Sequence, residues 1–132
     1  MKKQIENLLG LDVGTRKIGV ARVSMIARVP EPLTVLANDN TFSGRLQALV
    51  DQHQADALVV GLPRNLNGQE TAQSAYTRQF VSDHLQEYQV FWQDETLSSV
   101  SGQQNLEYYG QKDSRMLDAV AACIILEDYI RR

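Results

Sequence analysis

The stretch NLLGLDVGTRKIGVARVS, residues 7–24, decides how the fold begins. A mostly apolar run ends at Gly14, and a second run with partial alternation of apolar and polar residues begins at Lys17. Both patterns are typical of β-strands, and the connection between them is short enough only for a hairpin. We therefore predict two antiparallel strands at the start of the chain. Asp12 is unusual in this context, because it stands where a core strand normally carries an apolar side chain.

The remainder of the chain predicts strands that alternate with helices. We expect strands over residues 31–37, 55–63 and 88–95, and helices over residues 41–53, 70–85, 96–110 and 116–132. The segment over residues 31–37 is entered through Pro30 and Pro32, which favour an edge strand or the start of a strand. Alternation requires parallel strands joined by right-handed crossovers, whereas the opening hairpin is antiparallel. The sequence thus predicts an α/β fold, a mixed five-stranded sheet flanked by helices.

Inward-facing positions can also be predicted for two of the helices. In the helix over residues 70–85, the residues available to face the core are Ala72, Ala75, Phe80 and Val81. In the last helix, Asp118 shares a face with small alanines, which would let the helix approach the sheet closely with the carboxylate pointing inward.

Length and composition limit the class of protein. The chain has 132 residues, 43% of them hydrophobic and 22% charged, which predicts one globular domain over residues 1–132. The longest apolar run, residues 119–126, is far shorter than the roughly 20 residues of a membrane span. No signal peptide is recognised, and the single Cys123 allows no internal disulfide, so we expect a cytoplasmic protein without a membrane partner. The net charge of −3 argues against coating of nucleic acid through bulk charge, but it leaves a nuclease with acidic metal ligands open.

Three acidic positions stand out by their placement in the predicted elements. Asp12 lies in the carboxyl half of the first strand, Asp118 lies early in the last helix, and Asp94 and Glu95 end the fifth strand. Because neighbouring strand residues face opposite sides, only one of that pair can share the side of Asp12, and we assign Glu95 to it. Gathered carboxylates repel one another unless a hard cation such as Mg²⁺ neutralises them. Each acid taken singly also has an ordinary interpretation: a turn cap, a solvated strand end or a helix N-terminal charge.

Polar and basic residues near these acids are candidates for binding a phosphodiester. The segment GLPRNLNG, residues 61–68, follows a buried strand and precedes a helix, which is where open α/β sheets bind ligands, although an ordinary polar loop is the alternative. The candidate nucleic-acid contacts are Arg64, Asn65 and Asn67 in this loop, and Arg16, Lys17, Lys112 and Arg115 on the rim. Positive groups beside an acidic metal site fit a nucleic acid better than a sugar or a peptide.

Four motifs together resemble a known family. They are GLDVGTRKIGVA (10–21), ALVVGLPRNLNGQE (57–70), DETLSS (94–99) and LDAVAACIILEDYI (117–130). They resemble the YqgF/RuvX family of pre-16S rRNA nucleases, also described as Holliday junction resolvase-like proteins, over nearly the whole chain. The resemblance implies an RNase H-like fold and the catalytic acids Asp12, Glu95 and Asp118, which would hold one or two Mg²⁺ or Mn²⁺ ions. It implies a hydrolase that trims the 5′ end of the small-subunit rRNA precursor, by an in-line attack of water that leaves a 5′ phosphate. A ribosomal precursor particle is the implied partner.

The sequence departs from the family pattern at particular positions, and other functions remain open. Thr96 replaces the arginine that usually follows the acidic pair, and the loop before Asp118 is less basic than usual. These departures bear on substrate affinity and preference, because the three catalytic acids that the resemblance implies are all present. Resolution of four-way DNA junctions is the nearest alternative activity; resolvases act as symmetric dimers, whereas rRNA trimming requires none, so monomer and homodimer both remain open. A non-catalytic binding module would predict loss of one of the acids, and a sugar kinase or actin-like ATPase would need a second phosphate-binding lobe.

Overall fold

The computed structural model describes residues 4–96, 108–111 and 113–132, and its strands form one five-stranded sheet. The strands are β1 (Asn7–Val13), β2 (Lys17–Ser24), β3 (Glu31–Ala37), β4 (Ala57–Arg64) and β5 (Val90–Thr96). The helices are α1 (Phe42–His53), α2 (Ala72–His84) and α4 (Leu117–Arg131), the last preceded by a short 3-10 turn, η1 (Ser114–Met116). The sheet order is β3-β2-β1-β4-β5; β2 is antiparallel to both β1 and β3, and β4 is parallel to both β1 and β5. The predicted mixed sheet, its opening hairpin and its proline-entered edge strand are confirmed.

A tight turn joins the two strands of the opening hairpin. The backbone N–H of Gly14 donates to the carbonyl oxygen of Lys17 at 2.9 Å. A Cβ on Gly14 would lie 2.8 Å from that same oxygen, closer than real Cβ contacts come. The turn therefore needs glycine at this position, and it fixes the register in which Val13 faces Ile18.

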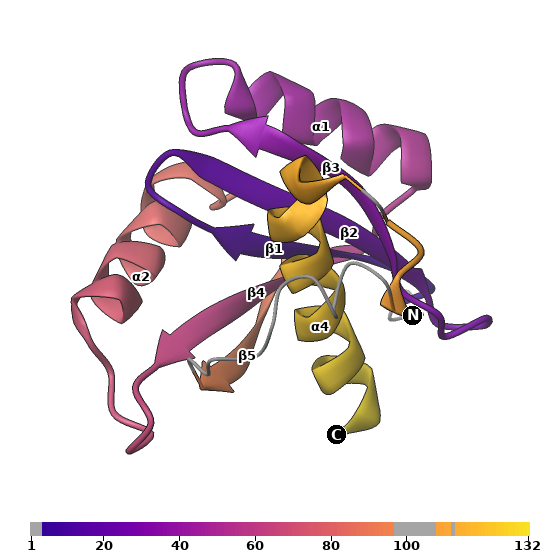
Figure 1. Ribbon diagram of the computed structural model, residues 1–132. Helices are drawn as coiled ribbons and strands as arrows, with labels where there is room; N and C mark the ends of the chain where they lie inside the picture. The colour runs from indigo at the N-terminus through magenta and orange to yellow at the C-terminus, as the bar shows by residue number, and fades with distance from the viewer. Residues whose placement is uncertain (1–3, 97–107, 112) are drawn as a thin grey trace.

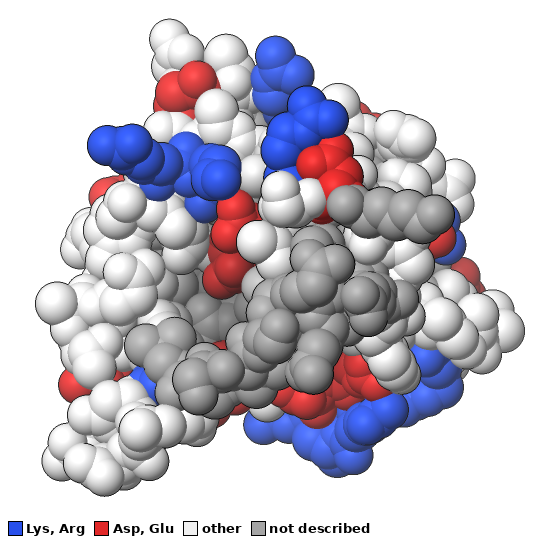
Figure 2. Space-filling model, in the orientation of Figure 1, with Lys and Arg blue, Asp and Glu red and all other residues white. Residues whose placement is uncertain are grey.

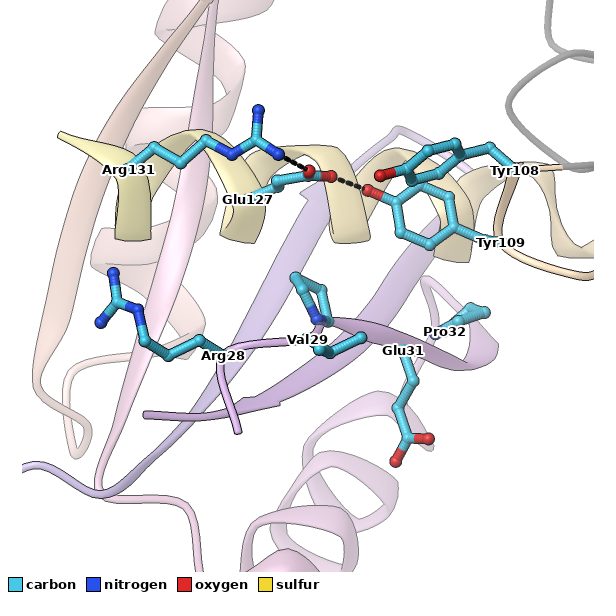
Figure 3. A pocket seen from close by; sticks show the side chains of 9 residues that line it. Arg28, Val29, Glu31, Pro32, Tyr108, Tyr109, Glu127 and Arg131 are labelled. Carbon is cyan, nitrogen blue, oxygen red and sulfur yellow. Dashed lines mark hydrogen bonds and ion pairs between the residues drawn. The ribbon is translucent and has the colours of Figure 1, made fainter. Parts of the chain in front are cut away.

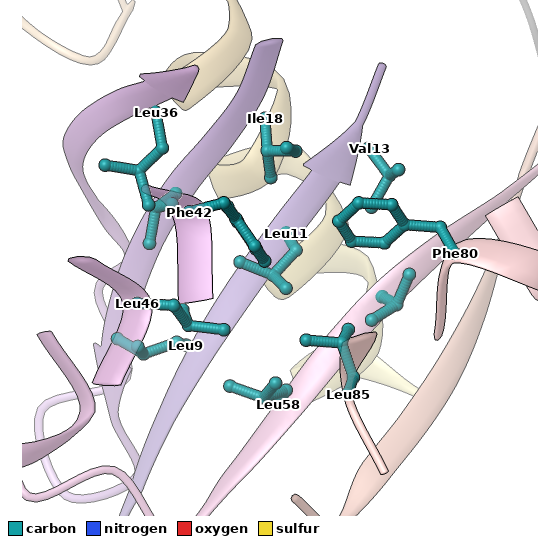
Figure 4. Packing of buried hydrophobic residues seen from close by; sticks show 12 residues of the cluster. Leu9, Leu11, Val13, Ile18, Leu36, Phe42, Leu46, Leu58, Phe80 and Leu85 are labelled. Atoms are coloured by element: carbon teal, nitrogen blue, oxygen red, sulfur yellow. The ribbon is translucent and has the colours of Figure 1, made fainter. Parts of the chain in front are cut away.

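Helices cover both faces of the sheet, with α4 on one and α1 and α2 on the other (Figure 1). The face toward α1 and α2 is a continuous apolar core (Figure 4). Its buried residues are Leu9, Leu11, Val13, Ile18, Val20, Leu36, Phe42, Leu46, Leu58, Val60, Phe80 and Leu85. The face toward α4 has a smaller core, in which the predicted burial of Cys123 is confirmed. Among the described residues, no helix combines the length and apolarity needed to cross a membrane.

The sheet's own glycines let α4 lie directly on it. A Cβ on Gly19 would fall 1.8 Å from the backbone oxygen of Asp118, and one on Gly10 would fall 2.9 Å from that of Ala122. Backbone therefore contacts backbone at both crossings. The helix runs across the sheet from β2, where Gly19 meets Asp118, to β5, where the rings of Phe91 and Tyr129 stack at 5.7 Å. This crossing determines which residues of α4 reach which strand.

Two predictions about helices need correction. Helix α2 begins at Ala72, two residues after the predicted start, because Thr71 and Ser74 form a capping box there. The predicted inward residues Ala72 and Ala75 are exposed, whereas Ser74 and Thr77 are fully buried beside Phe80. The hydroxyl of Ser74 donates to the Pro63 carbonyl, so hydrogen bonding places a polar residue inward.

The helix predicted over residues 96–110 falls mainly on residues 97–107, which lie outside the described residues; its first residue ends β5.

Candidate active site

Strand β1 places the Asp12 carboxylate on the face of the sheet covered by α4. Its neighbours Leu11 and Val13 point into the apolar core on the opposite face, so strand alternation directs Asp12 toward the helix. Burial, together with the negative charge of Asp118, raises the pKa of Asp12 from 3.8 to about 6. The carboxylate is thus held in a position that disfavours its own charge.

Asp118 lies in the first turn of α4, directly over β2. Its side chain is 36% exposed, and its Oδ2 atom lies 3.5 Å from Nζ of Lys17 at the start of β2. The prediction that Asp118 faces the sheet next to Asp12 agrees with this geometry. Figure 2 shows a strip of acidic side chains on this face with basic side chains beside it.

At the end of strand β5, the side chains of Asp94 and Glu95 point to opposite faces of the sheet. Glu95 follows Phe91 on the α4 side at even spacing, whereas Asp94 points to the other side and forms a 3.0 Å ion pair with Nε of Arg64. Across the ladder Glu95 pairs with Pro63. Gly61 of β4 leaves room for Ile125 of α4, since a Cβ there would lie 2.5 Å from its Cδ1, and the same position is 3.6 Å from Cγ of Glu95, an ordinary contact. The assignment of Glu95 rather than Asp94 to the side of Asp12 agrees with this arrangement.

The carboxyl of Glu95 has a pKa raised further than that of Asp12. Burial raises its pKa first, a hydrogen bond and the charge of Asp128 add to it, and Asp12 and Asp94 contribute further, so that the pKa reaches about 8. Its Oε1 atom is buried and has no hydrogen-bond partner. Asp128, near the end of α4, was missed by sequence reasoning, because only the crossing of α4 toward β5 brings it to Glu95.

These observations test whether the acids fit a divalent cation. Asp12 interacts electrostatically with both Asp118 and Glu95, so the site gathers carboxylates from β1, β5 and α4. Within the described ranges, no three acidic, histidine or cysteine side chains are yet spaced closely enough to hold one metal ion. The donors are nevertheless hard oxygens, one of them buried without a hydrogen-bond partner, and burial beside other carboxyls raises the pKa of Asp12 and of Glu95. Such a donor set suits Mg²⁺ or Mn²⁺.

Most of the polar side chains in and next to the loop after β4 form hydrogen bonds or ion pairs with other groups of the protein. Arg64 contacts Asp94, donates to the Gly68 carbonyl and lies 3.9 Å from Glu70, which in turn binds Arg78. Asn65 accepts hydrogen bonds from the backbone N–H groups of residues 67 and 69. Of the three predicted contacts in this loop, Asn67 alone is exposed.

The predicted basic rim is only partly placed beside the acids. Arg16 and Lys17 are exposed in the hairpin, and Lys17 contacts Asp118. Arg115 is exposed, but its guanidinium pairs with Asp113 at 2.7 Å. Asp113 also caps η1, whereas Met116 stands at the N-cap of α4 and makes no side-chain cap hydrogen bond. Lys112 lies outside the described residues.

A cavity of about 460 Å³ lies elsewhere, between α4 and the segment that leads into β3 (Figure 3). Its Glu127 accepts a hydrogen bond from Tyr109 and pairs with Arg131, as the dashed lines in Figure 3 mark. Burial and that hydrogen bond raise the pKa of Tyr109. None of the predicted site residues lines this cavity.

Comparisons with known proteins agree with this geometry. Residues 6–132 match the family described as RuvX, Holliday junction resolvase. A protein of Paraburkholderia phymatum is 38% identical over 128 residues, covering 93% of this chain and 83% of its own, and one of Sulfurihydrogenibium is 29% identical over 133 residues, covering 97% and 92%. The names of both describe candidate pre-16S rRNA nucleases.

Solved structures of resolvases share the fold. Thermus thermophilus RuvC in complex with a Holliday junction substrate aligns with a TM-score of 0.59 at 13% identity, covering 96% of this chain and 95% of its own. Fowlpox virus resolvase with Holliday junction DNA aligns at 0.55 and 9% identity, covering 95% and 97%. At these identities the likeness concerns architecture, and it confirms the RNase H-like fold.

Proposed function

Because the chain belongs to the RuvX Holliday junction resolvase family, a family of nucleases, we propose that it is a divalent-metal-dependent hydrolase of phosphodiester bonds in precursor rRNA. The observation that carries the proposal is the largely buried Asp12 carboxylate, with its pKa raised to about 6 between two further acids from other elements. A negative charge buried beside other acids is costly, and a bound cation offsets the cost.

Asp12, Glu95 and Asp118 would hold one or two Mg²⁺ or Mn²⁺ ions. A cation bound there supplies a lowered pKa for a water nucleophile and neutralises charge on the leaving oxygen. The protein's contribution is orientation: β1 fixes Asp12 from the core side, and the backbone contact at Gly19 fixes the height of Asp118 above the sheet. Lys17, 3.5 Å from Asp118, is placed to hold a substrate phosphate beside the acids.

The remaining proposed contacts differ in what they offer a nucleic acid. Arg16 and Asn67 are exposed, so both side chains are accessible to a nucleic acid. Arg64 and Asn65 act first by shaping the loop that carries Asn67. Arg115 would have to exchange Asp113 for a phosphate. Lys112, which lies outside the described residues, stays in the proposed set.

We favour precursor rRNA over branched DNA because the relatives at 29% and 38% identity carry the rRNA nuclease name. Trimming the 5′ end of pre-16S rRNA within a ribosomal precursor particle, in the cytoplasm, is then the role. The family description favours a second candidate, resolution of four-way DNA junctions, for which a homodimer would be required.

The purified protein should be assayed with Mg²⁺ or Mn²⁺ on precursor rRNA, single-stranded oligonucleotides and a four-way DNA junction. We expect cleavage of the rRNA, with Asp12→Asn and Glu95→Gln each reducing the rate by at least about a thousandfold. Asp94→Asn is the matched control, because this neighbouring carboxylate points to the other face of the sheet and should leave the rate within about twofold. Equal rates for wild type and Asp12→Asn would overturn the proposal, and preferential cutting of the junction would replace rRNA with DNA.

A further inference from the structure

Leu66, in the loop between β4 and α2, is exposed although it is a large apolar residue. Its side chain is 79% exposed, whereas the leucines of β1 and β4 are buried. Ile26 and Val29 are similarly exposed, but they lie beyond Ser24, which pairs with Asn7 at the end of β1 remote from Asp12. Leu117, which precedes Asp118 in α4, is 40% exposed, so Leu66 is the more exposed of these two leucines near the acids.

The sheet register places this loop beside Glu95. Pro63 of β4 pairs with Glu95, and Arg64 pairs with Thr96, so Leu66 follows two residues after the last paired position. Figure 1 shows the loop projecting beyond the ends of β4 and β5. A nucleic acid whose scissile phosphate lies at Glu95 would bring its neighbouring nucleotides toward this projection.

The loop is held rigidly enough to present one side chain. The backbone N–H of Asn65 donates to the Gln69 carbonyl, and the N–H of Gly68 donates to the Asn65 carbonyl, both at 2.9 Å. The side chain of Asn65 accepts two further backbone bonds, and Arg64 donates to the Gly68 carbonyl at 3.1 Å. Gly68 has a φ of 77°, the left-handed conformation that glycine adopts without strain. Because these bonds already order the loop, binding through Leu66 would cost little conformational entropy.

The chemistry of the loop favours a nucleobase over a protein partner. A stable protein interface buries about 800 Å² on each side, which one isolated leucine between polar neighbours cannot provide. An apolar side chain of this size does fit against the face of a base or between two bases at a helix end. The exposed amide of Asn67 is next to it and can bond a base edge.

We propose that Leu66 is a wedge that packs against a nucleobase next to the scissile phosphate and so favours cleavage where paired and unpaired strands meet. This specificity role rests on the proposed nuclease function. It is a contact to the substrate's bases and leaves the acidic chemistry unchanged.

Binding can be tested separately from cleavage with 2-aminopurine, whose fluorescence rises when it is unstacked. The base is placed at the branch point of a four-way DNA junction and at the stem–flank boundary of an RNA hairpin, and Asp12→Asn keeps both probes uncut. At saturating protein, we expect the fluorescence increase caused by Asp12→Asn to become at least about fivefold smaller when Leu66→Ala is added to that protein. The increase should persist when Leu66→Phe is added instead. Ile26→Ala is the matched control, an equally exposed apolar residue at the other end of the sheet.

Cleavage by the otherwise wild-type protein gives the second readout. The measured quantity is the cleavage rate on a substrate with a paired flank divided by the cleavage rate on a single strand. Leu66→Ala should lower this ratio by about tenfold, and Ile26→Ala should leave it unchanged. Equal fluorescence rises with and without Leu66, or no rise in Asp12→Asn alone, would overturn the wedge. If wild type cuts none of the substrates, the proposed function fails, while the fluorescence experiment still decides on Leu66.

Discussion

The two faces of the sheet are built differently. The face toward α1 and α2 is filled by apolar side chains, many of them fully buried (Figure 4). The face toward α4 carries glycines, a smaller apolar core and carboxyls whose pKa values are raised to about 6 at Asp12 and about 8 at Glu95. One face stabilises the fold, and the other holds charges at a cost in stability. The comparison separates residues that stabilise the protein from residues kept for chemistry.

Among substitutions outside the three acids, the largest loss of activity should come from separating α4 from the sheet. Gly19→Ala would push a Cβ into the Asp118 backbone oxygen, so the helix must move and take its carboxylate along. We expect activity to fall about a hundredfold, since a displacement near 1 Å costs this much, and stability to fall by about 2 kcal/mol. Kinetics and urea unfolding measure the two effects.

Gly44→Ala provides the control for that substitution. Gly44 lies in α1 with open space around its Cα, so alanine should raise the free energy of unfolding by up to about 1 kcal/mol without changing activity. Wild-type activity in Gly19→Ala would contradict the role given to close packing on the α4 face.

A cavity on the apolar face should affect stability alone. Leu46 of α1 is fully buried, and Leu46→Ala should lower the free energy of unfolding by about 3 kcal/mol. The rate per folded molecule should stay at the wild-type value, because the three proposed metal ligands lie on the other face of the sheet. The fluorescence of the single Trp92, which packs against the same core, follows the unfolding. A large loss of rate under conditions where Leu46→Ala is fully folded would contradict the claim that this face of the sheet contributes to stability and not to catalysis.

The acidic face predicts a pH dependence of stability in the metal-free protein. The folded pKa of Asp12, about 6, is higher than its ordinary 3.8, so the folded state binds the proton more tightly. Stability is therefore highest below pH 4 for this group and is lost as the pH rises through 6. Between pH 5 and pH 8, wild type in EDTA should lose about 1.5 kcal/mol more than Asp12→Asn. If the urea unfolding midpoints of the two proteins changed equally with pH across this range, the charge of Asp12 would not be the source of the lost stability.

The smallest effect concerns a polar residue on the apolar face. Ser74 is fully buried, donates to the Pro63 carbonyl and accepts from the N–H of Thr71. Ser74→Ala should lower the free energy of unfolding by about 1 kcal/mol, because it removes the helix cap and leaves these groups unpaired. Ser82→Ala, at an exposed position of the same helix, should change stability by less than half of that. Equal effects of the two substitutions would show that the cap contributes nothing.

Strand geometry made part of the site predictable from the sequence. Alternation along a strand is fixed by the backbone, so the residue order alone showed that only one of Asp94 and Glu95 can share the side of Asp12. The structure places Glu95 on that side and pairs Asp94 with Arg64 on the other. The phase of α2 could not be predicted in this way, because Ser74 faces inward through hydrogen bonds that composition does not reveal. The inward prediction for Ala72 was wrong for the same reason.

The surroundings of the acids were less predictable than the acids themselves. Asp128 reaches Glu95 only because α4 crosses the sheet toward β5, and no local pattern specifies that crossing. Arg64 looked like a free cation in the sequence, but carboxylates from β5 and from the following loop engage it. Long-range contacts of this kind depend on tertiary packing, which spacing along the chain does not contain.

The central claim is that the α4 face of the sheet binds a divalent cation through Asp12. Calorimetric titration of Mn²⁺ into the wild type, Asp12→Asn and Asp94→Asn tests it most directly, without any substrate. We predict saturable binding to the wild type and to Asp94→Asn, and its loss in Asp12→Asn. Equal binding by all three proteins, or binding by none of them, would contradict the account.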